Sequence, residues 1–172
     1  MKFYFINMSK KIIGVDPGTT VTGWGIISLQ GNRYQLIDCG TIHPSSKSSP
    51  EQKYLHIFTE LSSIIEIHTP DCLSVETQFM NKNFQSAIKV GMARGMAYLA
   101  AAQKNIPVFE YAPTKAKQAV TGKGNAPKSS VARMVKILLG LKELNVLEDA
   151  TDALALAITH AHFSRTAQFI SK

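Results

Sequence analysis

The first part of the chain groups its apolar side chains in short runs that are separated by glycine. Residues 11–15, 22–29 and 33–41 each have the length and the β-branched content of a strand. Gly18 and Gly31 lie in the breaks between these runs, where a chain can turn tightly. The pattern therefore predicts an antiparallel meander of three strands.

The spacing of apolar residues changes after this meander. Between residues 50 and 68 they recur at i, i+3 and i+4, which predicts a helix with one buried stripe. Further strands are predicted at residues 71–75 and 107–111, and further helices at residues 85–104, 113–120, 129–139 and 148–163. This order predicts an α/β fold, a mixed five-stranded sheet flanked by helices. Several α/β folds share the pattern, and the ribonuclease H-like architecture is one of them.

Length and composition fit a single domain with its own core. We predict that this domain covers residues 11–172 and that residues 1–10 form an N-terminal arm. Cys39 and Cys72 lie in predicted strands without C-x-x-C spacing, so neither a zinc site nor a disulfide framework is indicated. No apolar run approaches membrane-spanning length and no signal peptide is recognisable, so we expect a cytoplasmic protein.

Positive charge is concentrated in the second half of the chain. The net charge is +7, and between Glu76 and Glu143 eleven Lys or Arg residues accompany a single acid, Glu110. Such an asymmetry indicates a polyanionic partner. The alternative is an ordinary solvated surface, which most charged stretches are.

Acidic side chains follow two of the predicted strands. Asp16 comes after the apolar residues 12–15 and is followed by a Pro-Gly turn, and Glu76 comes directly after residues 71–75. Ligands of open α/β sheets bind at the carboxyl ends of the strands, so we interpret both acids as functional candidates. For Asp16 the alternative is a structural role, in which its side chain starts the turn by bonding to the backbone near Gly18.

Two further acids, Asp149 and Asp152, are spaced i, i+3 in the first turn of the last predicted helix. Either one alone has a structural explanation, because the helix dipole favours acids at this end. Together with Asp16 and Glu76 they make four candidate catalytic and metal-binding carboxylates. Oxygen-only ligands suit Mg²⁺ or Mn²⁺. We predict two ions, about 4 Å apart, that stabilise the attacking and leaving oxygens of a phosphodiester hydrolysis.

Lysines and one phenylalanine are the candidates for binding DNA. Lys117, Lys123 and Lys128 lie in a stretch without acids, and the glycines around Lys123 predict a loop that can follow a phosphate backbone. Phe79 and Lys82 lie in the predicted loop after the fourth strand, where a large apolar side chain is unexpected. The alternatives are solvated lysines and a phenylalanine that packs into the core.

Two other features have more than one interpretation. Gly91 and Gly95 lie four residues apart on one face of a predicted helix, which indicates close approach of that helix to the sheet or to a second subunit. We favour the second subunit. His160 lies two turns beyond Asp152 and could approach the metal site, although a core or surface role is the usual one.

Four segments of the chain carry a resemblance to a known family. They are residues 14–18 (Gly-Val-Asp-Pro-Gly), 74–79 (Ser-Val-Glu and, three residues later, Phe), 109–111 (Phe-Glu-Tyr) and 149–155 (Asp-Ala-Thr-Asp-Ala-Leu-Ala). In this order and spacing they resemble the RuvC-type Holliday junction resolvases.

The resemblance implies a ribonuclease H-like homodimer that nicks two strands symmetrically across a four-way DNA junction, in homologous recombination and DNA repair. It also implies dependence on a divalent metal and a branch-migration motor complex as partner. The family's metal-binding acids correspond to Asp16, Glu76, Asp149 and Asp152, its functional lysines to Lys117 and Lys128, and its aromatic residue at the crossover to Phe79.

Three other functions remain open from the sequence. Residues 16–20 also resemble the phosphate loop of actin-like ATPases and sugar kinases, but those proteins use two such domains. A non-catalytic protein that binds junctions through its basic surface would leave the four acids unexplained. A different ribonuclease H-like nuclease, for example one that acts on RNA hybrids, is distinguished only by its substrate.

Overall fold

The structure is a computed structural model that describes residues 10–77, 84–141 and 148–170. Its strands are β1 (Lys10–Asp16), β2 (Thr22–Gln30), β3 (Arg33–Ile42), β4 (Cys72–Glu76) and β5 (Val108–Tyr111). Its helices are α1 (Pro50–His68), α2 (Phe84–Gln103), α3 (Pro113–Thr121), α4 (Lys128–Leu138) and α5 (Glu148–Ile170).

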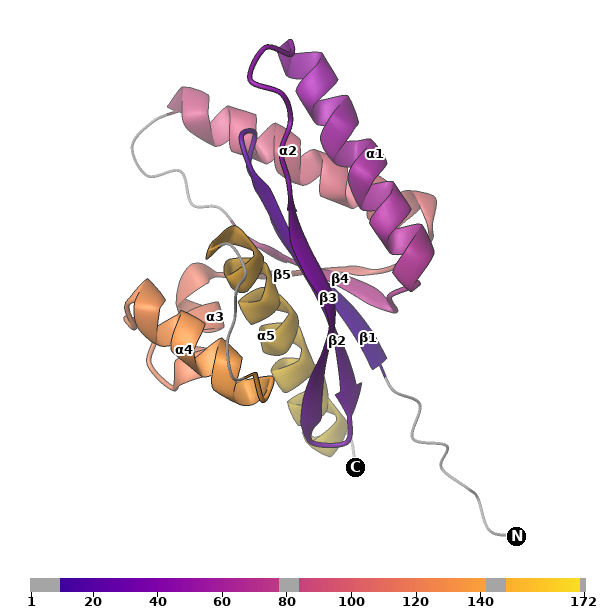
Figure 1. The fold of residues 1–172 in the computed structure, drawn as a ribbon. Coiled ribbons are helices and arrows are strands. Elements are labelled where there is room, and N and C mark those ends of the chain that lie inside the picture. The colour runs from indigo at the N-terminus through magenta and orange to yellow at the C-terminus, as the bar shows by residue number, and fades with distance from the viewer. Residues whose placement is uncertain (1–9, 78–83, 142–147, 171–172) are drawn as a thin grey trace, which may run out of the picture.

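The five strands form one mixed sheet in the order β3-β2-β1-β4-β5 (Figure 1). The first three strands pair antiparallel, whereas β1 with β4 and β4 with β5 pair parallel. The predicted meander and mixed five-stranded sheet are therefore confirmed. Helix α5 continues beyond its predicted end at residue 163, because residues 164–170 contain neither glycine nor proline to stop it.

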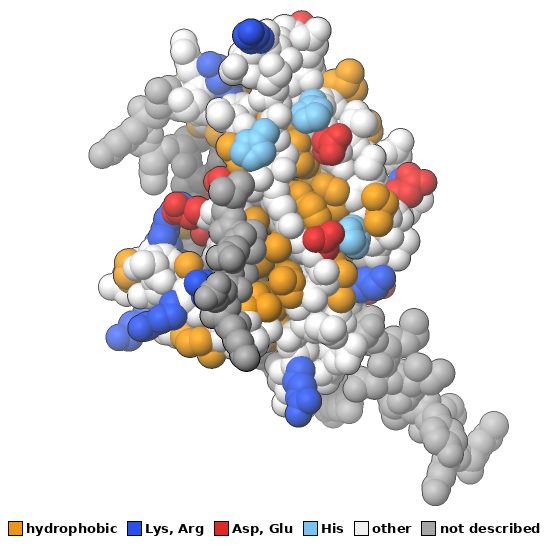
Figure 2. Space-filling model, in the orientation of Figure 1, with side chains coloured by type: hydrophobic (Ala, Val, Ile, Leu, Met, Phe, Trp, Pro, Cys, Tyr) orange, Lys and Arg blue, Asp and Glu red, His pale blue; other side chains and the backbone are white. Residues whose placement is uncertain are grey.

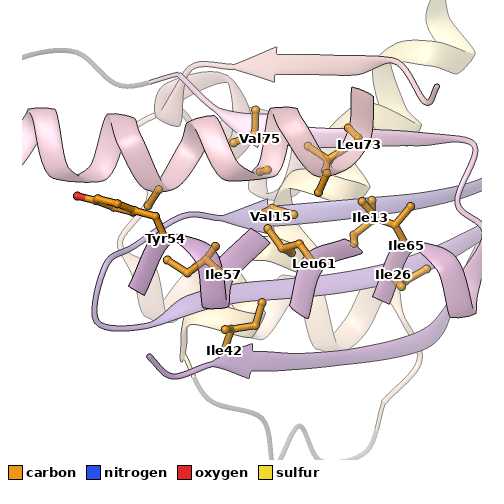
Figure 3. Close-up of a cluster of buried hydrophobic side chains, with 14 residues drawn as sticks. Ile13, Val15, Ile26, Ile42, Tyr54, Ile57, Leu61, Ile65, Leu73 and Val75 are labelled. Atoms are coloured by element: carbon orange, nitrogen blue, oxygen red, sulfur yellow. The ribbon is translucent and has the colours of Figure 1, made fainter. Parts of the chain in front are cut away.

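Helices cover both faces of the sheet. Helices α1 and α2 lie on one face, and α5 lies on the other with α3 and α4 outside it (Figure 1). The predicted apolar stripe of α1 points to the sheet, where Ile57 and Leu61 face Ile13 and Val15 of β1 (Figure 3). All four of these side chains are fully buried, so this cluster is the main core of the α1 face.

Side-chain alternation along β1 assigns its residues to the two faces. Ile13 and Val15 belong to the core on the α1 face, and Ile12 belongs to the core on the α5 face. Because successive residues of a strand point to opposite faces, Gly14 and Asp16 share the face of Ile12. The last residue of β1 is therefore directed to the side of the sheet that α5 covers.

Helix α5 packs directly on the strand backbone at glycine positions. A Cβ atom at Gly14 would overlap the carbonyl oxygen of Ala153, and one at Gly23 would overlap the carbonyl oxygen of Asp149. At Gly25 it would lie 2.6 Å from a side-chain carbon of α5. Any side chain at these positions would force the helix away from the sheet.

The glycines of α2 behave differently from what their spacing suggested. A Cβ atom at Gly91 or Gly95 would meet no described atom within 4 Å. Close approach of these glycines to the sheet is therefore the wrong alternative, because alanines such as Ala93 and Ala97 form the buried face of α2 instead. The other alternative, contact with a second subunit, stays a prediction.

Two predictions about the chemistry of the chain can also be compared with the structure. Cys39 and Cys72 are free thiols, as expected. None of the helices in residues 10–77, 84–141 and 148–170 is long and apolar enough to cross a membrane. The expected arm lies outside the described residues except for Lys10, which is the first residue of β1.

Replacing Gly14 with alanine should destabilise the protein by about 1–3 kcal/mol or more, because the new methyl group must displace the backbone of α5. Ser63→Ala is the control, since Ser63 is exposed on α1 and alanine is a better helix former than serine. Urea unfolding of both variants measures the difference. Equal effects of the two substitutions would contradict the contact between α5 and β1.

Candidate active site

Asp16 and Glu76 come together because their strands are parallel neighbours. Val15 of β1 pairs with Val75 of β4, so the residues that follow them lie side by side at the carboxyl edge of the sheet. Cys72 belongs to the core on the α5 face, and the alternation of β4 therefore turns Glu76 to that face as well. Both carboxylates thus end parallel strands and point toward α5.

Helix α5 brings the other two acids to the same place. The contact with Gly23 fixes the backbone of Asp149 against β2, and Asp152 follows one turn later. The Ser74 hydroxyl donates a hydrogen bond of 2.9 Å to the carbonyl oxygen of Leu156, which holds α5 on β4. The four acids therefore converge from two strands and the first turn of one helix.

The convergence appears directly in the electrostatics of Asp16. Burial raises the pKa of this carboxyl from its ordinary value of 3.8 to about 7, and the negative charges of Asp152, Glu76 and Asp149 add to the shift. Burial likewise raises the pKa of Glu76, again with a contribution from Asp152. Clusters of acids that raise one another's pKa are typical of functional sites such as metal-binding and active sites.

The alternative role of Asp16, starting the turn after β1, is taken by a different residue. The Gly18 amide donates to the Thr22 hydroxyl oxygen at 3.2 Å, and this hydroxyl donates back to the Gly18 carbonyl oxygen at 2.7 Å. Since Thr22 satisfies both backbone groups of Gly18, the turn does not need the Asp16 carboxylate. The functional interpretation of Asp16 is therefore favoured.

Lys128 supplies positive charge to the acid cluster. Its Nζ lies 3.0 Å from Asp152 Oδ2 and 3.2 Å from Glu148 Oε1, and the hydrogen bond to Asp152 raises the pKa of Lys128 above its usual range. Lys128 and Lys117 both oppose the increase in the pKa of Glu76. A pocket of about 210 Å³ lies at this point, and its lining includes Glu76, Lys117, Lys128 and Asp152.

The acid cluster fits a divalent cation by its chemistry. Among the described residues, no three or more His, Cys, Asp or Glu side chains form a preassembled metal site. Carboxylates repel one another and move apart unless a cation neutralises them. In this structure the Lys128 ammonium is the cation beside Asp152. An all-oxygen set of Asp and Glu is the environment that Mg²⁺ and Mn²⁺ prefer.

Of the other predicted DNA-binding residues, the structure describes Lys123, which lies apart from the acid pocket. Lys123 is exposed in the turn between α3 and α4, where its amide donates to the Thr121 hydroxyl oxygen at 3.2 Å. It does not line the pocket of Glu76 and Asp152. Phe79 and Lys82 lie outside the described residues, so their predicted roles stay predictions.

His160 is a core histidine. It is only 3% exposed, its Nδ1 lies 2.9 Å from the Tyr111 hydroxyl, and its ring centroid lies 4.1 Å from that of Phe109. Burial lowers its pKa to about 4, and the nearby Lys10 charge contributes. The side chain joins α5 to β5 and to the start of β1, so the usual structural interpretation holds.

Sequence reasoning missed Glu148. This acid begins α5 and contacts Lys128, although only Asp149 and Asp152 were singled out in that turn. A signal was present, because residues four apart on a helix share a face, and Glu148 is four residues before Asp152. It did not reveal that Lys128, from α4, would lie between them.

A protein-family model matches residues 12–160 and is described as "Crossover junction endodeoxyribonuclease RuvC". This chain belongs to the RuvC family. The RuvC protein of Pelotomaculum thermopropionicum is 48% identical to it over 151 residues, which are 88% of this chain and 92% of that protein. The resemblance that the four sequence segments indicated is thus confirmed.

Solved RuvC structures have the same fold. The Thermus thermophilus RuvC structure is 33% identical, has a TM-score of 0.85 and covers 91% of this chain and 96% of that one. T. thermophilus RuvC in complex with Holliday junction substrate is 31% identical with a TM-score of 0.83 and the same coverage. The fold is ribonuclease H-like, as predicted.

Membership of the RuvC family decides the class of reaction. RuvC proteins are divalent-metal-dependent endodeoxyribonucleases, so the chain is a nuclease. The phosphotransferase and the non-catalytic binding protein are therefore the wrong alternatives. The family shows dependence on a divalent metal, and the identity and number of the ions are proposed below.

The raised pKa of Asp16 predicts how the metal-free protein responds to pH. Folding raises the pKa of Asp16, so the folded state holds this proton more tightly than the unfolded state does. With respect to Asp16, stability is therefore greatest below pH 3.8, the pKa in the unfolded chain, and is lost as the pH rises through about 7. In a chelator, wild-type protein should lose stability between about pH 5 and about pH 8, and Asp16→Asn should lose less and be the more stable at the upper pH.

Chemical denaturation at both pH values measures this effect, with Glu60→Gln, at an exposed position on α1, as the control. The same pH dependence in wild type and Asp16→Asn would show that Asp16 is not the group responsible. If Asp16→Asn were clearly less stable than wild type at both pH values, Asp16 would have a structural role instead.

Proposed function

We propose that this protein resolves four-way (Holliday) DNA junctions by symmetric hydrolysis of two phosphodiester bonds, in homologous recombination and DNA repair. The observation that carries the proposal is the convergence of four acids beside two lysines at the carboxyl ends of β1 and β4. The similarity to T. thermophilus RuvC, which has been solved with a Holliday junction substrate, supports the choice of DNA. A branch-migration motor complex as partner rests on the family resemblance alone.

The proposed catalytic and metal-binding residues are Asp16, Glu76, Asp149 and Asp152. Two Mg²⁺ or Mn²⁺ ions held by these residues would supply charge stabilisation for the phosphodiester displacement and would lower the pKa of bound water. The chain's own contribution is to hold four oxygen ligands at one edge of a rigid sheet. The partial burial of Asp16 strengthens its electrostatic interactions with the other acids.

Basic residues next to the acids are the proposed contacts for the DNA backbone. Lys117 and Lys128 border the acid pocket, whereas Lys123 extends the basic surface along the turn between α3 and α4. Figure 2 shows Lys and Arg side chains on this part of the molecule, over α4. Phosphate contacts of this kind position a duplex without reading its sequence.

One cleavage assay tests the proposed function. Purified protein is incubated with a mobile four-way junction, a linear duplex and an RNA/DNA hybrid, each with and without Mg²⁺. Metal-dependent paired nicks in the junction, with little cleavage of the other substrates, are the expected result. Preferred cleavage of the hybrid would instead favour the other class of ribonuclease H-like nuclease.

Asp152→Asn should abolish junction cleavage and leave junction affinity within a few-fold of wild type. The carboxylate is proposed to serve the chemistry, whereas lysines supply most of the binding energy through phosphate contacts. Cleavage and electrophoretic mobility-shift assays on the same preparation separate the two effects. Retained cleavage would remove Asp152 from the catalytic set.

We infer that the protein is a homodimer and that α2 forms the contact. Phe84, Ile88 and Met92 are spaced by four residues, and they are 67%, 46% and 48% exposed. Leu99 continues this apolar face and also lines an apolar groove of about 570 Å³ between α1 and α2. Symmetric cleavage needs two active sites, and a two-fold contact through one self-complementary face would supply them.

A charge introduced into this apolar face should disrupt the dimer. We expect wild type to sediment as a dimer at micromolar concentration and Met92→Lys to sediment as a monomer. Ile67→Lys is the matched control, because Ile67 is 73% exposed on α1 and is expected to leave the dimer intact. A monomeric wild type, or a dimeric Met92→Lys, would rule out this contact.

A further inference from the structure

Glu148 is an acid outside the proposed metal-binding set that shares a lysine with it. The Lys128 ammonium lies 3.2 Å from Glu148 Oε1 and 3.0 Å from Asp152 Oδ2. Glu148 and Asp152 are four residues apart on α5, so both carboxylates lie on one face of the helix, one turn from each other. Lys128 therefore contacts both Asp152, which is proposed to bind metal, and Glu148, which is not.

The two carboxylates differ in how they face solvent. The Glu148 side chain is 69% exposed, whereas that of Asp152 is 28% exposed and repels the charges of Asp16 and Glu76. A divalent cation in the acid cluster would bind Asp152 and would repel the Lys128 ammonium. Lys128 then has to leave Asp152, and Glu148 is the carboxylate that it already contacts.

The backbone of Lys128 limits where its side chain can go. Lys128 is the first residue of α4, which packs against α5 through buried residues such as Val131 and Val135. Only the flexible side chain can move when a cation arrives. Without an acceptor beside the cluster, a 66% exposed lysine would sample solvent and lose its fixed position.

We propose that Glu148 is a positioning residue, which retains the Lys128 ammonium beside the acid cluster when a divalent cation replaces it on Asp152. Lys128 thus remains within reach of the phosphate that is to be cleaved. The inference rests on the proposed function of the four acids, and it adds a role for a residue that itself binds neither metal nor DNA.

A double-mutant cycle separates this role from direct effects of the Glu148 charge. The four proteins are wild type, Glu148→Gln, Lys128→Met and the double variant. Two quantities are measured at physiological salt, which screens the long-range field of an exposed carboxylate. They are Mn²⁺ affinity by titration calorimetry without DNA and the single-turnover rate of junction cleavage at saturating Mn²⁺.

In the presence of Lys128, Glu148→Gln should weaken Mn²⁺ binding and slow the single-turnover rate by about twofold to fivefold each, the range of an exposed ion pair. The affinity falls because Lys128 loses its second acceptor when the cation takes Asp152. In the Lys128→Met background, the same substitution should change neither quantity by as much as twofold. Glu148→Asp should restore most of both values.

Glu51→Gln is the control for an acid at a helix end, because Glu51 lies in the first turn of α1. It should leave both quantities unchanged. Equal effects of Glu148→Gln in the two backgrounds would overturn the proposal, since Glu148 would then act without Lys128, and so would the absence of any effect in either background. Failure of wild type to cleave junctions would count against the proposed function, while the Mn²⁺ cycle would still test the link between Glu148 and Lys128.

Discussion

The backbone contact between α5 and the two strands β1 and β2 is the constraint on which the site depends. Gly14 and Gly23 leave no side chain between the sheet and the helix, so the first turns of α5 lie directly on the strands. Only at this separation can Asp149 and Asp152 add their charges to that of Asp16. Close packing of this kind allows little adjustment, because interiors have the density of organic crystals.

The acids of the site repel one another, and this unfavourable arrangement is explained by the proposed binding of divalent cations. Asp16 is partly buried beside three other acids, and its pKa of about 7 reflects how unfavourable its ionised form is without a cation. Lys128 and Lys117 reduce the repulsion only partly, because both act from the edge of the cluster. A binding site that is unfavourable when empty gains correspondingly when divalent ions neutralise it.

The elements divide the proposed tasks between the two faces of the sheet. Helix α5 carries two of the acids, and α3 and α4 next to it carry the lysines that border the pocket. The exposed apolar face of α2 lies on the other side of the sheet (Figure 1). A dimer formed through α2 would therefore leave the acid cluster accessible to DNA.

The sequence alone determined the elements, because periodicity and glycine breaks are local properties, and it located Asp16 and Glu76 at strand ends. It did not determine which face of α2 meets the sheet, and Gly91 was for this reason assigned a possible contact that alanines make. The pairing of Glu148 with Lys128 was equally out of reach. Such contacts depend on how separate helices pack, and spacing within one helix shows which residues share a face but not what that face touches.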